Sequence, residues 1–304
     1  MKAIILAGGS GTRLSPLTNA ISKQLLPIYD KPMIYYPLSN IMNLGIREIM
    51  IISTIEDTPK IKKLLGNGNN IGINIEYKIQ PSPDGIAQAF ILAKDFIKND
   101  SVCLILGDNI FYGSEISGKV IDDKFIKAVN VKDGAYIVAY KVSDPKRYGV
   151  VELDNNDKAL SIEEKPQNPK SDFAVTGWYF YDNDVINIAQ NIKPSPRWEL
   201  EITDVNNEYL KRKKLTILHM NRGFAWLDAG THNSLFKASQ FIEVIENRQG
   251  IKIGCIEEIA FNKKYINKME LQKLADKFKI GNNYGDYLRK LIKYVDWKCF
   301  YKRP

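Results

Sequence analysis

The feature that most constrains this chain is a glycine-rich loop directly after its first apolar segment. Residues 3–7 are apolar, and the hexapeptide GGSGTR follows, ending at Arg13. The apolar run is typical of a buried strand, and glycines let a ligand approach the loop backbone closely. Successive backbone N–H groups attract an anion, and the arginine adds a permanent positive charge. The segment predicts a strand followed by a phosphate-binding loop; a tight strand-to-helix turn without a ligand is the alternative.

Spacing excludes two better-known glycine loops. The dinucleotide pattern G-x-G-x-x-G, begun at Gly8 or Gly9, would need glycine in place of Ser10 or Leu14. The P-loop pattern requires a lysine after its second glycine, whereas the letters here are GTR. A nicotinamide dehydrogenase is therefore not expected.

Composition bounds the class of protein. At 304 residues the chain exceeds a typical domain of about 100–200 residues, so one large domain with an appendage, or two domains, is expected. The net charge of +8 comes from scattered lysines and arginines, which suits attraction of phosphorylated substrates and does not indicate a nucleic-acid partner. Three dispersed cysteines and two histidines predict neither a zinc site nor a disulfide framework. Without a signal-type segment or a run of about 18 apolar residues, we expect a soluble, cytoplasmic protein with no membrane partner.

The first part of the chain alternates between two patterns. Apolar, β-branched runs predict strands at residues 2–7, 48–53, 73–78 and 102–106. Helical spacing lies between them, at residues 32–44, 58–65 and 85–98. This alternation predicts an α/β fold, a Rossmann-like mixed and mostly parallel sheet flanked by helices.

After residue 134 the pattern becomes richer in strands. They are expected at residues 135–141, 148–153, 159–164, 175–181 and 215–220, with helices at 184–191, 199–212 and 231–247. We interpret this part as an inserted β-rich sugar-binding region. The predicted organisation is a catalytic domain over 1–249, with a nucleotide-binding part (1–134) and a sugar-phosphate part (135–249), followed by a small helical extension over 250–304. The extension, with its aromatic tail at 297–301, is a candidate oligomer or regulatory contact.

Two aspartates follow strand-like segments. Asp108 comes after the apolar residues 102–106, and Asp228 lies in the segment 224–230. Parallel sheets bind ligands beyond the carboxyl ends of their strands, so the loops at 8–13, 80–84 and 107–109 should share one rim. A carboxylate there can hold Mg²⁺, which binds one or two carboxylates plus phosphates, although a cap for the next turn is the alternative. Two such aspartates beside a phosphate loop predict metal-assisted phosphoryl or nucleotidyl transfer.

Two lysines are placed to assist such a transfer reaction. Lys23 follows the first loop, and Lys165 stands in the segment EEKP, where its neighbours fix a strand-to-turn position. Asp204 is expected on a helix outside the site, and His219 and His232 belong to no acid–base arrangement. If the nucleophile is already anionic, as a sugar phosphate is, no general base is needed. Catalysis then requires only aligning two polyanions and neutralising charge.

The residues carry a family resemblance. The segment 8–14, followed by Lys23 and Pro27, resembles the signature of sugar-1-phosphate nucleotidylyltransferases. Further segments are similar to the glucose-1-phosphate thymidylyltransferase branch of this family, at residues 22–33, 80–89, 106–109, 147–152, 163–166, 174–177 and 226–231. The match runs from residue 1 to about residue 290. Ser-Lys-Gln at 22–24 favours this branch over the uridylyl branch, where Pro-Lys is usual.

The resemblance implies roles for particular residues. Those expected to bind the nucleotide are Gly8, Gly11, Thr12, Arg13, Gln24, Gln80 and Gly85. Those expected around the sugar phosphate are Asn109, Tyr148, Gly149, Glu164, Lys165, Val175 and Arg197. Asp108 and Asp228 would hold the cofactor Mg²⁺, and the catalytic set would be Arg13, Lys23, Asp108, Lys165 and Asp228.

The resemblance also implies an activity. It is the reaction of dTTP with α-D-glucose 1-phosphate to give dTDP-glucose and pyrophosphate, the first step toward dTDP-sugars such as dTDP-rhamnose. A homotetramer inhibited by a dTDP-sugar at a second site is implied too. Departures from the family pattern are Ser15 for histidine, Trp178 for a smaller residue and Trp198 for glycine, with both indoles expected near the sugar. Uridylyl transfer, another sugar 1-phosphate, or a non-catalytic nucleotide-sugar sensor are the alternatives.

Overall fold

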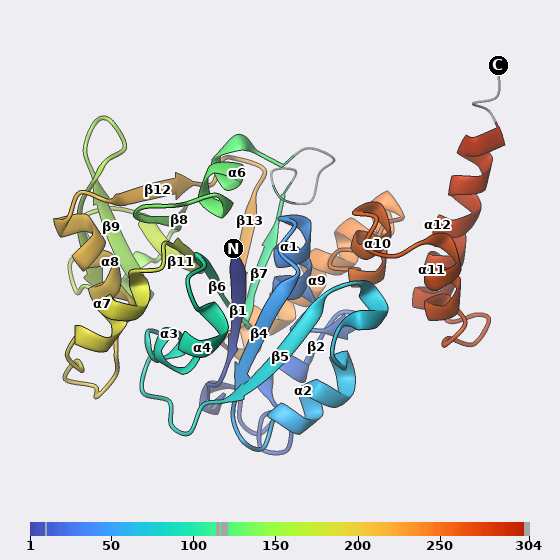
Figure 1. Cartoon of the computed structure of the whole chain (residues 1–304), viewed down its shortest axis with the longest axis horizontal. Coiled ribbons are helices and arrows are strands. Elements are labelled where there is room, and N and C mark those ends of the chain that lie inside the picture. The colour runs from blue at the N-terminus through green and yellow to red at the C-terminus, as the bar shows by residue number, and fades with distance from the viewer. Residues whose placement is uncertain (10, 114–115, 117–120, 301–304) are drawn as a thin grey trace.

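The central element of the computed structural model is a nine-stranded mixed sheet (Figure 1). The structure describes residues 1–304 except 10, 114–115, 117–120 and 301–304, and the side chains of 294–300 are also outside the description. Four parallel strands form the first half of the sheet: β1 (Lys2–Ala7), β4 (Glu48–Ser53), β5 (Asn74–Ile79) and β6 (Val102–Leu106). The expected mixed α/β sheet is confirmed, and this half of it is parallel throughout.

The second half of the sheet is mainly antiparallel. It contains β8 (Ala135–Lys141), β9 (Gly149–Leu153), β10 (Ala159–Glu164), β11 (Phe173–Tyr181) and β12 (Leu215–His219). Strand β11 joins the halves, because it pairs with β6 and β9 along one edge and with β8 along the other. Two short pairs lie outside this sheet: β2 (Pro27–Ile28) with β3 (Lys31–Pro32), and β7 (Asn109–Tyr112) with β13 (Ala225–Asp228).

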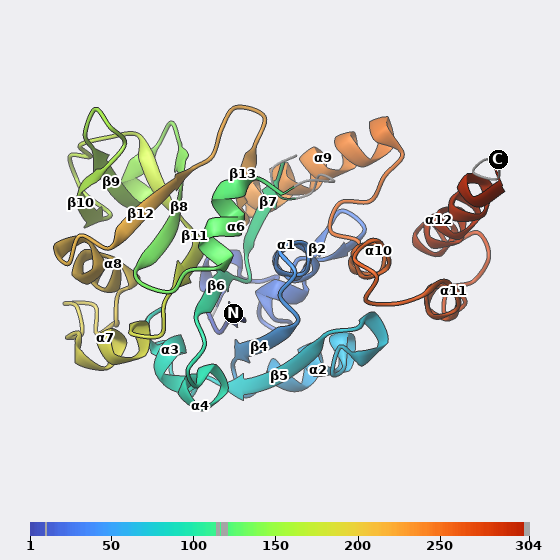
Figure 2. The same cartoon turned by 45° about the horizontal axis from the view of Figure 1, so that its top comes forward.

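Helices cover both faces of the sheet (Figure 2). They are α1 (Tyr35–Asn43), α2 (Thr58–Leu65), α3 (Gln88–Leu92), α4 (Lys94–Ile97), α6 (Asp123–Val129), α7 (Val185–Asn191), α8 (Ile202–Lys211), α9 (His232–Gln249), α10 (Ile256–Asn262), α11 (Lys268–Ala275) and α12 (Asn283–Phe300). Successive residues of β1 alternate between two cores: Ile5 faces the core under α1 and α10, and Ile4 faces the core under α3, α7 and α8. Both faces are therefore buried, as a parallel sheet requires.

Several boundaries differ from the sequence expectation. The helix expected at 85–98 is two short helices, because Ala93 leaves helical geometry at ψ 6°. The helix expected at 32–44 begins only at Tyr35, since Lys31 and Pro32 form β3. Residues after 250 are helical as predicted, and α11 and α12 lie at one end of the molecule (Figure 1). Within the described residues, none of the helices is both long and apolar enough to cross a bilayer.

Candidate active site

A cavity of about 350 Å³ lies beyond the carboxyl ends of β1 and β6, where the sheet geometry predicts a ligand site. Seven separate segments of the chain line it. Predicted site residues in its wall are Gly8, Gly11, Thr12, Arg13, Lys23, Gln24, Gln80, Gly85, Asp108, Glu164, Lys165 and Arg197. The structure therefore brings most of the predicted set to one place.

The glycine loop forms one side of the cavity. It leaves β1 at Ala7 and enters a short 3-10 helix, Thr12–Leu14, that carries Arg13. A Cβ on Gly8 would lie 1.9 Å from the Gln80 side-chain oxygen, so a side chain at position 8 would displace the Gln80 amide. Ser10 of the motif lies outside the described residues.

A tight ion pair occupies the floor of the cavity. The Lys23 ammonium donates to Asp108 Oδ2, and Asn109 Nδ2 donates to Asp108 Oδ1 at 2.9 Å. Burial alone would raise the pKa of the Asp108 carboxyl, but Lys23 and Asn109 outweigh it and hold that pKa below its usual range. Asp108 is therefore ionised at neutral pH and already carries a cationic neighbour.

The second aspartate, Asp228, lies on a strand that is distant from Asp108 in the sequence. In the β7–β13 pair, Asp228 lies opposite Asn109, and this register brings it beside Asp108. The pKa of Asp228 is raised, first by burial and then by the negative charge of Asp108. Arg147 Nη2 lies 3.6 Å from Asp228 Oδ2. A Cβ on Gly230 would lie 2.9 Å from Asp228 Oδ1 and 3.4 Å from Arg13 Nη2, so this carboxylate borders the arginine of the glycine loop.

The two carboxylates at this point have the donor chemistry of a magnesium site. Two converging carboxylates beside a phosphate loop match Mg²⁺, which takes its remaining ligands from phosphates and water. Asp228 repels Asp108, as its raised pKa indicates, and a divalent cation between them would relieve that repulsion. Within the described residues, no group of three His, Cys, Asp or Glu side chains could hold a metal ion.

Amide side chains form the next part of the wall. Gln24 Oε1 accepts from Ser22 Oγ at 2.9 Å, and Gln80 Nε2 donates to Gln88 Oε1 at 2.7 Å. Both glutamines are buried, so these bonds fix the direction of their amides. Gly85 has a φ of +105°, and a Cβ there would lie 2.4 Å from the Leu200 carbonyl oxygen. Amides fixed in this way can read the hydrogen-bonding edge of a base.

The opposite wall carries a group of half-exposed charged side chains. Glu164 Oε1 lies 3.4 Å from the Lys165 ammonium and 3.6 Å from Arg197 Nη2. Thr203 Oγ1 donates to Glu164 Oε2 at 2.7 Å, and Arg197 pairs with Glu201 at 2.8 Å. The Lys165 and Arg197 side chains are 48% and 42% exposed, so both cations remain accessible to an anion.

Some predicted residues lie just behind the described lining of the cavity. These are Asn109, Tyr148, Gly149, Val175 and Asp228. Asn109 is buried, and its Oδ1 accepts from Gly177 N and Trp226 Nε1, so it supports the wall. Gly149 pairs with Glu164 and Val175 across the sheet. The ring centroids of Tyr148 and Trp226 are 5.0 Å apart, and the two ring planes are tilted by 58°.

The two unusual indoles have different positions. Trp178 was expected near the sugar, and this expectation is wrong: it is fully buried among Phe111, Phe125 and Phe180 and donates to Cys103 Sγ. The alternation of β11 turns it to the core face. Trp198 is 83% exposed, one residue after Arg197, with a φ of +61°.

Sequence reasoning missed several residues of the site. Arg147 stands in the segment RYGV and was not assigned a role, although its guanidinium reaches Asp228. Glu201, which holds Arg197, and the apolar wall residues Ile86 and Leu106 were missed as well. The dense charge over residues 197–201 was the signal that could have identified Glu201. Asp204 lies in the first turn of α8, outside the described cavity wall, as predicted.

Comparisons with known proteins agree with this geometry. The family model for nucleotidyl transferases matches residues 2–244. A glucose-1-phosphate thymidylyltransferase of Neisseria meningitidis is 53% identical over 293 residues, covering 96% of this chain and 100% of the relative. One from Xanthomonas campestris is 51% identical over 292 residues, covering 96% and 97%.

Solved structures show the same architecture. A crystal structure from Bacillus anthracis, described as a glucose-1-phosphate thymidylyltransferase in complex with sucrose, is 44% identical with a TM-score of 0.73. It covers 79% of this chain, which in turn covers 94% of that chain. A UDP-glucose pyrophosphorylase complexed with UDP-glucose has a TM-score of 0.70 at 23% identity, over 80% and 98% of the two chains, and shares the fold.

Proposed function

Since this chain belongs to the nucleotidyl transferase family and is a glucose-1-phosphate thymidylyltransferase by its full-length relatives, we propose how its cavity performs that reaction. A phosphate oxygen of α-D-glucose 1-phosphate attacks the α-phosphorus of dTTP. The new P–O bond forms as the bond to the bridging oxygen breaks, and pyrophosphate leaves with that oxygen. The products are dTDP-glucose and pyrophosphate, and no proton has to be removed from the nucleophile.

The observation that carries this proposal is the convergence of four cations on one cavity. Arg13, Lys23, Lys165 and Arg197 come from segments far apart in the sequence and all line it. Two polyanionic substrates can be brought into line there only if their charge is neutralised. Arg13, beside the glycine loop, would bind the departing pyrophosphate, with Gly8, Gly11 and Thr12 around the triphosphate.

The two walls would divide the substrates between them. Gln24, Gln80 and Gly85 would read the thymine base through their fixed amides and backbone. Lys165 and Arg197 would bind the sugar phosphate. Glu164 would accept from sugar hydroxyls, with Tyr148, Gly149, Val175 and Asn109 shaping this side from behind.

We propose Mg²⁺ as the divalent metal, held by Asp108 and Asp228. When bound, the ion would neutralise charge on the phosphates. Lys23 would keep Asp108 ionised and oriented. Arg147 would fix the orientation of the Asp228 carboxylate, which it contacts.

The test is pyrophosphate release across a matrix of substrates. dTTP and UTP are each combined with the 1-phosphates of glucose, galactose, mannose and N-acetylglucosamine. Turnover should be greatest with dTTP and glucose 1-phosphate. A maximum with UTP or another sugar would move the enzyme to another branch, and binding without turnover would favour the sensor alternative.

A second cavity supports the proposed feedback inhibition by a dTDP-sugar, the product of a pathway such as dTDP-rhamnose synthesis. It has a volume of about 710 Å³ between α1, β7 and α10, with Asn40, Asn43, Lys252 and Asn262 in its wall. The buried Asn40 Nδ2 lacks a hydrogen-bond partner within the described structure, and a bound sugar or base would satisfy it. Equilibrium dialysis of dTDP-sugars against wild type and Asn40→Ala tests this site.

The remaining proposals concern assembly and location. We propose a catalytic domain over residues 1–249 and a helical extension over 250–304 that contributes to a homotetramer. Exposed apolar side chains on α9 and α11, Phe236, Val244 and Met269, support such a contact. Light scattering at micromolar concentration tests the tetramer. The buried free thiols Cys103 and Cys255 support a cytoplasmic location.

A further inference from the structure

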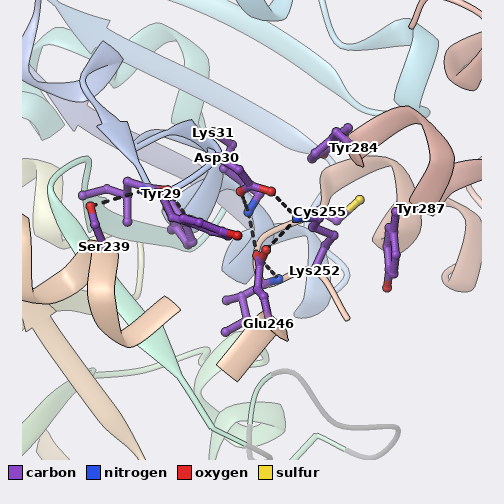
Figure 3. A network of polar contacts seen from close by, with 12 residues as sticks. Tyr29, Asp30, Lys31, Ser239, Glu246, Lys252, Cys255, Tyr284 and Tyr287 are labelled. Atoms are coloured by element: carbon purple, nitrogen blue, oxygen red, sulfur yellow. Dashed lines mark hydrogen bonds and ion pairs between the residues drawn. The ribbon is translucent and has the colours of Figure 1, made fainter. Parts of the chain in front are cut away.

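Four charged side chains form a closed ring away from the catalytic cavity (Figure 3). Asp30 and Lys31 come from the β2–β3 hairpin, Glu246 from the end of α9, and Lys252 from the loop that follows α9. We call these four residues the ionic ring. It joins segments more than 200 positions apart in the sequence.

Each carboxylate of the ionic ring contacts both ammonium groups. Glu246 Oε1 accepts from Lys31 at 2.8 Å, and Glu246 Oε2 accepts from Lys252 at 2.8 Å. The two oxygens of Asp30 accept from the same two lysines, one each. Ile253 N also donates to Glu246 Oε1 at 2.8 Å. Two positive and two negative charges therefore compensate one another with every carboxylate oxygen engaged.

Burial makes this arrangement costly. The Lys31 and Glu246 side chains are each 2% exposed, and Lys252 is 6% exposed. Taking charges out of water offsets most of what their attraction returns, so a buried ion pair is seldom more stable than apolar packing. Such a ring fixes the relative positions of the segments that carry it, because only one arrangement of the four side chains pairs every charge. Its position in the fold then decides what it holds in place.

The ionic ring lies next to the segment that carries two cavity residues. Lys23 and Gln24 form a short 3-10 helix directly before the β2–β3 hairpin. The backbone returns after the hairpin to bind this helix: Met33 N donates to Leu26 O at 2.9 Å, and Ile34 N donates to Gln24 O at 3.0 Å. Residues 22–34, here called the Lys23 loop, are thus clamped at their far end by the ring.

The tip of the Lys23 loop is strained. Tyr29 has a φ of +59°, a conformation that side-chain-bearing residues seldom adopt. Its N–H donates to Ser239 Oγ of α9 at 3.2 Å, and the Lys252 ammonium lies 5.5 Å from its ring centroid. Strain of this kind persists only where the surroundings over-determine the backbone. The contacts from α9 and the following loop supply that constraint.

We propose that the ionic ring is a positioning device for catalysis: it holds the Lys23 loop so that Lys23 and Gln24 meet the nucleotide. The four ring residues act through the loop and do not touch substrate. Loosening the ring should affect the nucleotide side of the reaction, where Lys23 and Gln24 lie, and spare the sugar side. This asymmetry separates positioning from a general contribution to stability.

The test measures steady-state pyrophosphate release by Asp30→Asn, with dTTP and glucose 1-phosphate varied separately. Rates are taken well below the unfolding temperature and per folded protein from circular dichroism. We expect kcat to fall at least tenfold and KM for dTTP to rise at least fivefold, while KM for glucose 1-phosphate changes less than twofold. Removing one carboxylate leaves the ring with an excess positive charge, and Asp30→Asn/Lys252→Met should recover part of both losses because Lys31 and Glu246 remain paired.

A matched control separates positioning from destabilisation. Tyr209→Phe removes a buried hydroxyl that donates to Asp182, far from the Lys23 loop, and should lower the denaturation midpoint without changing either KM. If Asp30→Asn does not fold, Lys31→Arg keeps the charge but changes its shape, and should still raise KM for dTTP. Unchanged kcat and KM in a folded ring variant would overturn the proposal. So would an equal rise in KM for dTTP in Tyr209→Phe.

Discussion

The charged side chains around Glu164 in the catalytic cavity and those of the ionic ring differ in how far solvent reaches them. Glu164 lies 3.4 Å from Lys165 and 3.6 Å from Arg197, and both cations are more than two-fifths exposed. In the ionic ring, Lys31 and Lys252 each lie 2.8 Å from Glu246 and are almost fully buried. Charges in contact with solvent can exchange partners with an incoming phosphate at little cost. The ring charges are paired only with one another and lie away from the cavity, so they serve to fix the backbone.

The largest effect should come from opening the ionic ring. Lys31→Met leaves Asp30 and Glu246 each short of one cationic partner in a buried site. Breaking a buried pair costs about 3–5 kcal/mol, and we expect the free energy of unfolding to fall by that amount. Urea denaturation followed by circular dichroism measures it. Lys170→Met is the control, because this half-exposed lysine forms an ion pair at the surface with Glu152 and should cost about 1 kcal/mol or less.

The catalytic cavity should respond in rate rather than in stability. Asp108→Asn removes the carboxylate that pairs with Lys23 and is proposed to hold Mg²⁺. We expect kcat to fall about 10²- to 10³-fold, the usual loss when one charge-stabilising group is removed. Pyrophosphate release at saturating Mg²⁺ is the measurement, with the exposed Asp204→Asn as control. Near-normal turnover of Asp108→Asn would reject the metal assignment.

A smaller effect on substrate binding is expected at Lys165, which is proposed to bind the sugar phosphate. Lys165→Ala removes a half-exposed cation that lies 3.4 Å from its partner Glu164. Since a hydrogen bond to a charged group is worth about 1.5 kcal/mol or more, KM for glucose 1-phosphate should rise about tenfold. Separate titrations of the two substrates show which one is affected. If dTTP binding weakens instead, Lys165 serves the nucleotide; Lys170→Ala should change neither constant.

Most of the residues that the sequence analysis singled out lie in one cavity because they follow local signals. Strands β1, β4 and β6 have the predicted ends, since each is an uninterrupted apolar run that ends where glycine or polar residues begin. The rule that ligands bind beyond such ends then located Arg13 and Asp108 on one rim.

The parts that were missed depend on distant pairing. Strand β7 has four residues, and its partner β13 lies more than a hundred positions away, so no local pattern marks it. The ionic ring is similar: Lys31 and Glu246 are 215 positions apart, and single charges in a sequence are usually solvated. Trp178 was misplaced because the family pattern, and not the alternation of β11, was used to place it.

The carboxyl group of Glu257 extends this comparison, because it is buried without an ion pair among the described residues. Glu257 of α10 accepts from the Tyr284 hydroxyl at 2.6 Å, and burial raises its pKa above the usual range of a glutamate. As pH rises from about 4.5, the unfolded chain ionises first while the folded chain keeps its proton. The free energy of unfolding therefore falls until the pH passes the raised pKa, by about 1.4 kcal/mol for each unit of displacement.

Glu257→Gln should remove this loss, because a neutral amide can still accept from Tyr284. The variant and wild type should have equal stability below about pH 4.5, and the variant should be the more stable at pH 8. Urea denaturation midpoints at pH 4.5, 6 and 8 measure the difference, and the exposed Glu76→Gln should show none. A constant difference between variant and wild type across these pH values would mean that Glu257 is compensated like the acids of the ionic ring. In that case a buried charge in this molecule is compensated even without a described lysine within ion-pair distance, and ion pairing would no longer set the ionic ring apart.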